Sequence, residues 1–543
     1  MVFARRSTTL LAAIIASCAM VLSLTACTSD NKTVVDGQTT VTSNSAGGVA
    51  VFTPSDGITL NQQTPLNKWA KLVPDLTKAL VDAGFKKGDI DHTTSDSLAK
   101  QSRAIQDFVV DHLSNNTTDD SGIAIAPDNM TLLVAPVVEA DASTRQYGDY
   151  VSQNLSTNDV TDEGATSDGE SSEDDSSKDD SSNTESDSTA SDEQAQAVDR
   201  LVSSLKLAKE SGMHVVLLGN SIEGYKPDAF VKFSDAQTIG KLQAEKMVSK
   251  LKLDKASKDN PKYIEVLLPY TAMDEKGNAN DSTFAQEAFR GIWQVLGSYY
   301  QKGVVESPSG TLDGKSTEND WQAVAYDAAK EGSTAKVLDK RLAKTDGQST
   351  LTRIDGIITM NDYIASEVVK ELDDLGYTGS AADINPQITI SGIVGNITGK
   401  KDLSRDAVPD PIKSPENDNA NDSSSSDDDA DKDTSASDKD RDSQWPLVTG
   451  YGAYVSNIPS IVNGKQWMTG MEDRQTIATD IAQACAKLNK DEALNSMPSI
   501  RNSEVGGVKK IPTINEPLLA VSAGNLKSAL IDPGYISLAD AGL

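Results

Sequence analysis

The sequence contains few of the residues that build most catalytic and metal sites. It has only 3 cysteines and 3 histidines in 543 residues. His92, His112 and His214 are far apart, and none lies at ligand-type spacing from a cysteine, so we expect no metal site and no histidine-based catalytic triad. We therefore predict a protein that is not an enzyme and that needs no cofactor.

A basic face is also missing. The formal net charge is -31, and two Ser/Asp-rich tracts carry most of it: residues 159–193 hold 14 acidic residues against one lysine, and residues 416–442 hold 11 against three basic ones. Nucleic-acid binding needs clustered basic residues, so we predict no such partner. Tracts without apolar residues cannot bury a core, and we expect disordered insertions at about 145–195 and 413–444. A divalent-cation or cell-wall contact is the alternative, although neither tract has the spacing of a calcium loop.

The N-terminus has the pattern of an export signal. Arg5 and Arg6 precede an apolar run, Leu10–Leu24, that is short for a membrane span. Leu24-Thr25-Ala26-Cys27 follows and resembles the lipobox of bacterial lipoproteins. We expect Cys27 to carry a lipid that holds the chain on the extracytoplasmic face of the cell membrane. A plain secretory signal with a chance cysteine is the alternative.

Between the tracts, short apolar runs alternate with helical patterns. The predicted strands are Gly48–Phe52, Gly122–Ala126, His214–Leu218, Tyr263–Leu268, Ile357–Met360 and Leu447–Gly450. The predicted helices are Leu66–Ala83, Leu98–Leu113, Gln196–Glu210, Ile239–Leu251, Phe284–Tyr300, Trp321–Leu342 and Thr476–Leu488. Continuous apolar strands joined by helices indicate parallel sheets covered on both faces. The chain is long enough for two such α/β lobes in series.

One strand end combines two possible roles. Ile357–Met360 stops at Asn361 and Asp362, and a helical pattern then runs to Gly376. Ligands of open α/β sheets bind at the carboxyl ends of strands, whereas Asn and Asp are also preferred helix N-caps. The sequence leaves both roles open for these two residues, and one side chain can serve both.

Three longer stretches resemble one family in the same order. "DAFVKFSDAQTIGKLQAEKMV" (residues 228–248), "GYGAYVSNIPSIVNGKQWMT" (450–469) and "VKKIPTINEPLLAVSAGN" (508–525) are similar to segments of type I periplasmic sugar-binding proteins of ABC importers, in the branch that binds xylose and other monosaccharides. The resemblance implies an α/β fold of two Rossmann-like lobes with parallel sheets, joined by a three-strand hinge, with sugar held between the lobes.

The resemblance also implies how the chain is divided. The expected parts are a lipoprotein signal peptide (1–26), a tether (27–47), an N-lobe (48–233), a C-lobe (234–469), a segment returning to the N-lobe (470–511), and a final hinge crossing with a C-terminal tail (512–543). Ile388–Gly392 and Leu447–Gly450 are both strand-like and flank the second tract, and either Ile388 or Leu447 begins the strand that matches the family's C-lobe strand at this point. We favour Leu447, which makes 388–399 an extra segment.

A sugar site needs hydrogen-bonding side chains and an aromatic face. The candidate ligand-binding residues are Ser55, Asp56, Asn220, Asp235, Trp321, Asn361, Asp362 and Tyr451. Ser55 and Asp56 follow the first strand. The other candidates match or adjoin positions of the family's site, with an N-cap as the alternative role for Asp235 and core packing for Trp321.

Three charges of the family's site are replaced here. Gly219-Asn220 stands in place of an Asp-Arg pair, Gly452 in place of an aspartate, and Glu472 in place of a lysine. A site without its polar partners rejects a ligand strongly, so we do not expect the usual sugar bound in the usual way. The resemblance favours a lipid-anchored receptor that delivers a small solute, such as a saccharide, to ABC permease subunits. A surface sensor or interaction module without sugar transport is the alternative.

Overall fold

The computed structural model describes residues 34–35, 38–39, 46–55, 65–115, 126–138, 145–150, 153–156, 185–273, 281–343, 350–381 and 444–543. The chain divides into two units, Met1–Asn44 and Ser45–Leu543. In the first unit, β1 (Val34–Val35) pairs antiparallel with β2 (Gln38–Thr39). None of the helices in the described ranges is both long and apolar enough to cross a bilayer. The second unit holds the two lobes.

A seven-stranded sheet forms the N-lobe. Its order is β17-β18-β9-β7-β5-β3-β4. The strands are β3 (Gly48–Pro54), β4 (Ile90–Ser95), β5 (Met130–Val134), β7 (His214–Leu218), β9 (Ala229–Lys232), β17 (Ile500–Val505) and β18 (Val508–Asn515). Neighbouring strands are parallel except at the edge, where β17 and β18 form an antiparallel hairpin.

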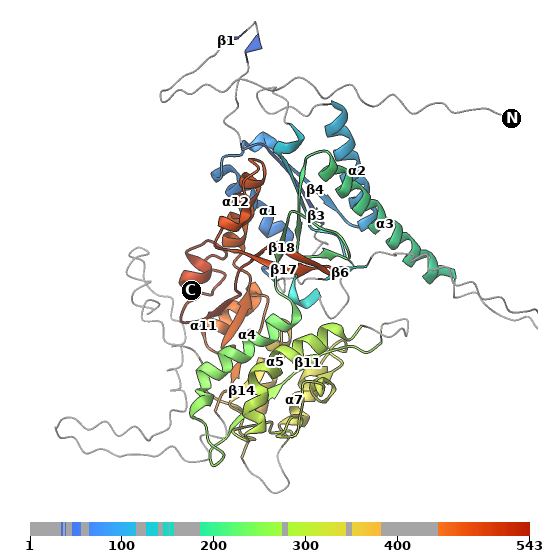
Figure 1. The fold of residues 1–543 in the computed structure, drawn as a ribbon. Coiled ribbons are helices and arrows are strands. Elements are labelled where there is room, and N and C mark those ends of the chain that lie inside the picture. Colours follow the sequence, from blue (N-terminus) through green and yellow to red (C-terminus); the bar gives the residue numbers. More distant parts are fainter. Residues whose placement is uncertain are drawn as a thin grey trace, which may run out of the picture. The chain divides into compact units, whose positions relative to one another are not determined.

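Helices cover both faces of this sheet because alternate strand residues point to opposite sides. Val49 and Val51 of β3 face one core, with α1 (Trp69–Asp82) and α12 (Arg474–Leu488). Ala50 and Phe52 face the other core, with α2 (Leu98–Asn115) and α3 (Glu185–Glu210). Figure 1 shows these two helix pairs on opposite sides of the strands. The continuous apolar strands of the sequence are therefore explained by burial on both faces.

The C-lobe repeats this plan around a smaller parallel sheet. Its order is β12-β10-β14-β15. The strands are β10 (Lys262–Val266), β12 (Val305–Glu306), β14 (Gly356–Ile358) and β15 (Leu447–Val448). One face packs on α4 (Ala236–Leu251) and α5 (Thr283–Gln301), and the other on α7 (Ser333–Arg341) and α8 (Asp362–Leu375).

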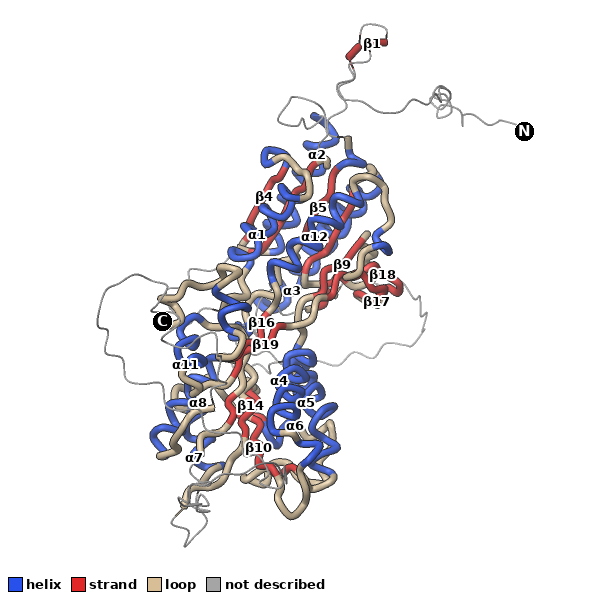
Figure 2. The backbone as a smooth tube through the Cα atoms, turned by 90° about the vertical axis from the view of Figure 1, so that its left-hand side faces the viewer, coloured by secondary structure: helices blue, strands red, loops and turns tan. Residues whose placement is uncertain are grey.

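The chain passes between the lobes three times. It leaves β9 for α4 at residues 233–235, returns from β16 (Met468–Met471) to α12 at 472–473, and leaves β18 for β19 (Leu519–Ser522) at 516–518. β16 and β19 pair antiparallel, and Figure 2 shows this pair between the two larger sheets. The structure thus confirms the predicted α/β class with mainly parallel sheets, as two lobes with three crossings.

One strand of the N-lobe was not predicted. β5 (Met130–Val134) lies between β3 and β7 and follows a short 3₁₀ turn, Pro127–Asn129, whereas residues 122–125 of the predicted strand Gly122–Ala126 lie outside the described ranges. Both runs are short and apolar, so periodicity alone does not separate them.

The predicted helix Trp321–Leu342 is wrong in its centre. It is broken into α6 (Trp321–Val324), β13 (Ala325–Tyr326) and α7, because Ala325 and Tyr326 pair with β11 (Leu268–Pro269). We expected a disordered insertion at about 145–195. Within it the structure describes residues 145–150 and 153–156, and α3 begins at Glu185. In the C-lobe, Leu447 begins the strand that pairs with β14, as favoured, and residues 388–399 lie outside the described ranges.

Candidate functional site

The turn from β14 into α8 serves first as a helix cap. Asn361 is fully buried, and its Oδ1 accepts a hydrogen bond from the Ile364 amide at 2.9 Å. Met360, just before it, has a φ of +68°, a left-handed conformation that is uncommon for a non-glycine residue and that sharpens the turn. Gly376 ends the helix at a φ of +92°.

Asn361 also reaches the N-lobe. Its Nδ2 donates a hydrogen bond to Oε1 of Gln146 at 3.0 Å. Gln146 lies in a short 3₁₀ turn, Arg145–Tyr147, at the head of the first expected insertion. One side chain therefore caps α8 with its oxygen and contacts the other lobe with its nitrogen.

The buried carboxylate of Asp362 accepts hydrogen bonds from donors within the C-lobe. The donors are the Tyr454 amide (2.9 Å), the Thr469 hydroxyl (2.9 Å) and the Gln466 amide group (2.7 Å). Burial raises the pKa of Asp362 to about 6, although these hydrogen bonds oppose the rise. A Cβ atom at Gly450 would come within 2.1 Å of the carboxylate. Asp362 thus holds two loops of its own lobe together.

A second cluster joins the two lobes beside the crossings. Tyr451 is fully buried, and its hydroxyl is hydrogen-bonded to Oγ of Ser234 and accepts from Nδ2 of Asn67 at 3.0 Å. The Glu472 carboxylate accepts from the Ser234 amide at 2.6 Å and from the Tyr451 hydroxyl at 3.5 Å. Burial raises the pKa of Glu472 to about 7, against the effect of these hydrogen bonds, and nearby Asp235 raises it further.

Residues 145–150 contact both lobes, and we call them the bridging segment. Its tip is Gln146 and Tyr147. The Gln146 carbonyl accepts a hydrogen bond from the Tyr454 hydroxyl at 2.7 Å. The buried ring of Tyr147 belongs to the same apolar cluster as the core of the C-lobe, with ring centroids 4.7 Å from Phe284 and 6.2 Å from Tyr451.

The base of the bridging segment, Asp149 and Tyr150, is fixed to the N-lobe. Asp149 forms an ion pair with Lys68 at 2.8 Å and accepts from the Trp69 amide at 3.0 Å. The Tyr150 hydroxyl donates to the Lys68 carbonyl at 2.5 Å, and its ring stacks on Phe233 with centroids 4.8 Å apart.

Asn220 supports the chain just after this base. Its Oδ1 accepts from the Gln153 amide at 3.0 Å, and its Nδ2 donates to the Pro136 carbonyl at 2.9 Å. Asn220 thus holds residues 136 and 153 in position.

Comparisons with known proteins give likeness in overall structure alone. No family model and no curated protein matches the chain. Among solved structures, an ABC transporter solute-binding protein from Clostridium phytofermentans with bound β-D-glucose is 16% identical at a TM-score of 0.43, over 91% of this chain and 99% of that one.

Two further structures are similar in the same way. A carbohydrate transporter solute-binding protein from Chloroflexus aurantiacus, in complex with D-glucose, is 18% identical at a TM-score of 0.43, over 92% of this chain and 98% of that one. An arabinose-binding protein from Geobacillus stearothermophilus is 10% identical at a TM-score of 0.41, over 89% and 99%. At these scores the likenesses carry no argument about what this chain binds.

Two of the remaining candidates, Asp235 and Trp321, have structural contacts within the chain. Asp235 is the N-cap of α4, where it accepts from the Thr238 amide at 2.7 Å and pairs with Lys232 at 2.9 Å. Burial acts to raise the pKa of Asp235, but these hydrogen bonds and the Lys232 charge outweigh it and lower the pKa. Trp321 is 8% exposed and packs edge-on against Tyr270 in the C-lobe core. Ser55 is exposed after β3, and Asp56 and Cys27 lie outside the described residues.

Several residues that the sequence analysis did not propose as ligands contact Asn361, Asp362 or Tyr451, among them Asn67, Gln146, Tyr147, Ser234 and Tyr454. The stretch "RQYGDY" was a usable signal, because two of the 13 tyrosines of the chain fall within six residues at the head of a polar insertion. In the described part of the chain, no group of three or more His, Cys, Asp or Glu side chains is arranged to hold a metal ion.

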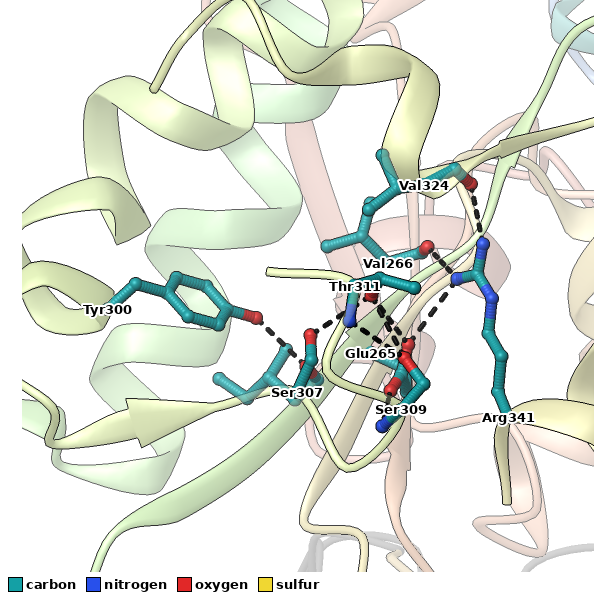
Figure 3. A network of polar contacts seen from close by, with 9 residues as sticks. Glu265, Val266, Tyr300, Ser307, Ser309, Thr311, Val324 and Arg341 are labelled. Atoms are coloured by element: carbon teal, nitrogen blue, oxygen red, sulfur yellow. Dashed lines mark hydrogen bonds and ion pairs between the residues drawn. The ribbon is translucent and has the colours of Figure 1, made fainter. Parts of the chain in front are cut away.

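A buried ion pair in the C-lobe is structural. Glu265 of β10 pairs with Arg341 of α7 at 3.4 Å, and Arg341 also donates to the carbonyls of Val266 (2.5 Å) and Val324 (2.9 Å) (Figure 3). The Glu265 carboxylate also accepts from the Ser309 amide at 2.8 Å. The pair fastens a loop and a helix to the end of a strand.

Proposed function

We propose that this chain is a lipid-anchored, extracytoplasmic solute-binding protein that takes up a small polar solute, a saccharide, between its two lobes and presents it to ABC permease subunits. One observation carries the proposal: polar and aromatic side chains from both lobes contact one another at the carboxyl ends of the C-lobe strands. Asn361 and Tyr451 follow β14 and β15, and they contact Gln146, Asn67 and Ser234. Ligands of α/β sheets bind at such strand ends.

The chemistry of these side chains suits a saccharide. Sugar hydroxyls both donate and accept hydrogen bonds, and amide, hydroxyl and carboxyl groups can do the same. Asn361, Asn67 and Glu472 supply these groups, and the rings of Tyr451 and Phe284 supply an apolar face. Separation of the lobes would free these groups for a solute.

The lipid anchor rests on the sequence "LTAC" after the apolar run, which ends at Cys27. The test is the replacement Cys27→Ala in the producing cell. We expect the wild-type chain in the membrane fraction with its signal segment removed, and the variant chain either released or retained with the signal segment still attached. A variant chain that loses the signal segment and still stays in the membrane fraction as the wild-type chain does would remove the anchor from the proposal.

A second function is favoured by the contacts within the chain. Asp362, Asn220 and Asp235 are all held by hydrogen bonds from this same chain. An interaction module or sensor could keep the two-lobed fold with these contacts permanently in place and without transporting sugar.

Thermal unfolding in the presence of saccharides separates the two functions. D-glucose, D-xylose, D-ribose and L-arabinose are added to the full chain one at a time. A solute at a hundredfold excess over its Kd adds about 2.7 kcal/mol to the free energy of unfolding, which appears as a higher Tm. A shift with one of them supports the receptor, and no shift with any of them supports the second function.

Two substitutions at Asn361 refine this test. Asn361→Ala removes both the cap and the side-chain amide, whereas Asn361→Ser keeps a capping oxygen and removes the amide nitrogen. If the amide binds solute, both variants lose the saccharide shift, and only Asn361→Ala loses the stability that the cap gives. A full shift in Asn361→Ser would exclude the side-chain amide from the site.

A further inference from the structure

We propose that the tip of the bridging segment, Gln146 and Tyr147, is an intramolecular occupant of the solute position: it holds the two lobes together and has to withdraw before a solute can bind. The solute part of this inference rests on the proposed function. The occupancy itself rests on the contacts of the tip, which do not depend on any ligand.

The tip makes the contacts that a saccharide would need. The Gln146 side chain accepts from Asn361 at 3.0 Å, and its carbonyl accepts from Tyr454 at 2.7 Å. The Tyr147 ring packs against Phe284 and Tyr451 as the apolar face of a sugar ring would. Tyr147 is only 1% exposed, although it is joined in sequence to a segment anchored on the N-lobe.

The C-lobe side of this contact is itself well supported. Asp362 accepts from the backbone amide of Tyr454, and the hydroxyl of Tyr454 then holds the Gln146 carbonyl. Asn361 is fixed by its cap contact to Ile364 while it donates to Gln146. The surface that receives the tip is therefore positioned by bonds within its own lobe.

The base of the segment remains on the N-lobe when the tip moves. Asp149 and Tyr150 are bound to Lys68 and Trp69. Gly148 lies between tip and base with a φ of +94°, and a Cβ atom there would come within 2.6 Å of the Asn67 carbonyl oxygen. Only glycine fits this conformation and this close approach, so residue 148 is suited to be the pivot.

An occupant of this kind lowers the apparent affinity for solute. The measured Kd is the intrinsic Kd divided by the fraction of molecules in which the tip has withdrawn. Removing the tip should therefore both loosen the lobes and tighten solute binding. Removing a structural loop that lies outside the solute site would loosen the lobes at most and would not tighten solute binding.

Hydrogen exchange of the full chain without added solute tests the occupancy. The variant Gln146→Ala/Tyr147→Ala is compared with Tyr299→Ala, which removes an aromatic ring from the same helix as Phe284 but whose hydroxyl contacts Asp254 in the same lobe. We expect amide exchange in residues 65–69 and 449–455 to rise roughly tenfold or more in the double variant, from the loss of one aromatic contact set and one hydrogen bond. It should stay at the wild-type level in Tyr299→Ala. Wild-type exchange in the double variant would overturn the proposal.

A double-mutant cycle covers the case in which the double variant fails to fold. Gln146→Ala and Asn361→Ser each remove one end of the same hydrogen bond and leave the aromatic packing in place. If the tip bridges the lobes in solution, the two effects on stability are non-additive. Strict additivity would overturn the proposal.

Calorimetric titration with D-glucose, D-xylose, D-ribose and L-arabinose separates failure of this inference from failure of the proposed function. Raised exchange in the double variant without saccharide binding supports the occupant and counts against the receptor. Saccharide binding of equal Kd in both chains, with unchanged exchange, supports the receptor and overturns the occupant. Raised exchange together with a lower Kd in the double variant supports both.

Discussion

Replacing Glu472 with glutamine should remove a specific pH dependence from the stability of this protein. Glu472 is 1% exposed and lies at the second crossing between the lobes, where it accepts hydrogen bonds from Ser234 and Tyr451. Glutamine has nearly the same shape and keeps an oxygen that can accept both bonds. It resembles the protonated acid and cannot ionise.

The sign of the effect follows from the raised pKa. Burial raises the pKa of Glu472 from its usual 4.5 to about 7, so between these values the folded chain binds more protons than the unfolded chain. The free energy of unfolding therefore falls as the pH rises through this window. The full loss is about 3 kcal/mol, of which roughly 2 to 3 kcal/mol falls between pH 5 and pH 8.

The assay is denaturant unfolding of both chains at pH 5 and pH 8. We expect Glu472→Gln to gain roughly 2 to 3 kcal/mol relative to wild type on going from pH 5 to pH 8, because the other titrating groups cancel in the difference. A control variant at exposed Glu306 should show the same change in the free energy of unfolding between pH 5 and pH 8 as wild type. An equal difference between Glu472→Gln and wild type at the two pH values would refute the reasoning.

Three further substitutions test the buried polar contacts. Asp362→Ala removes the carboxylate that accepts from the buried donors of Tyr454, Thr469 and Gln466. Each donor left without this acceptor costs about 1–3 kcal/mol, so the free energy of unfolding should fall by several kcal/mol. A fall below about 1 kcal/mol would show that these donors find other partners. Arg341→Ala leaves the Glu265 carboxylate buried without its cation and should cost about 3–5 kcal/mol in urea unfolding, part of which Glu265→Gln should recover in the double variant; no recovery would contradict the pairing. Asp235→Ala removes the cap of α4 and should lower stability by about 1 kcal/mol, and an unchanged midpoint would show that the cap contributes nothing.

The sequence predicted the elements whose signals are local. The helix after Asn361 and its stop at Gly376 can be derived from residue types at fixed spacing, and the cap at Asn361 is one of the two roles that the sequence left open for Asn361 and Asp362. The paired, doubly covered sheets follow from continuous apolar strands. The choice of Leu447 over Ile388 followed from the family resemblance, and the pairing of β15 with β14 agrees with it.

Long-range contacts were not predictable in the same way. β5 was missed because two apolar runs adjoin the same turn, and the break at Ala325 exists only because β11 lies beside it. The composition around residues 145–150 is polar, which indicates disorder, yet Tyr147 and Tyr150 are almost completely buried. The two closely spaced tyrosines are a local signal of burial, but their partners Phe284 and Phe233 are distant in sequence, so the local pattern does not reveal what they contact.

The ratio of two dissociation constants for a saccharide, one for the wild-type chain and one for Gln146→Ala/Tyr147→Ala, tests most directly whether the tip occupies the solute position. We expect the double variant to bind the saccharide more tightly, because the tip no longer competes for the position between the lobes. A ratio of one, or the absence of saccharide binding by either chain, would contradict this expectation.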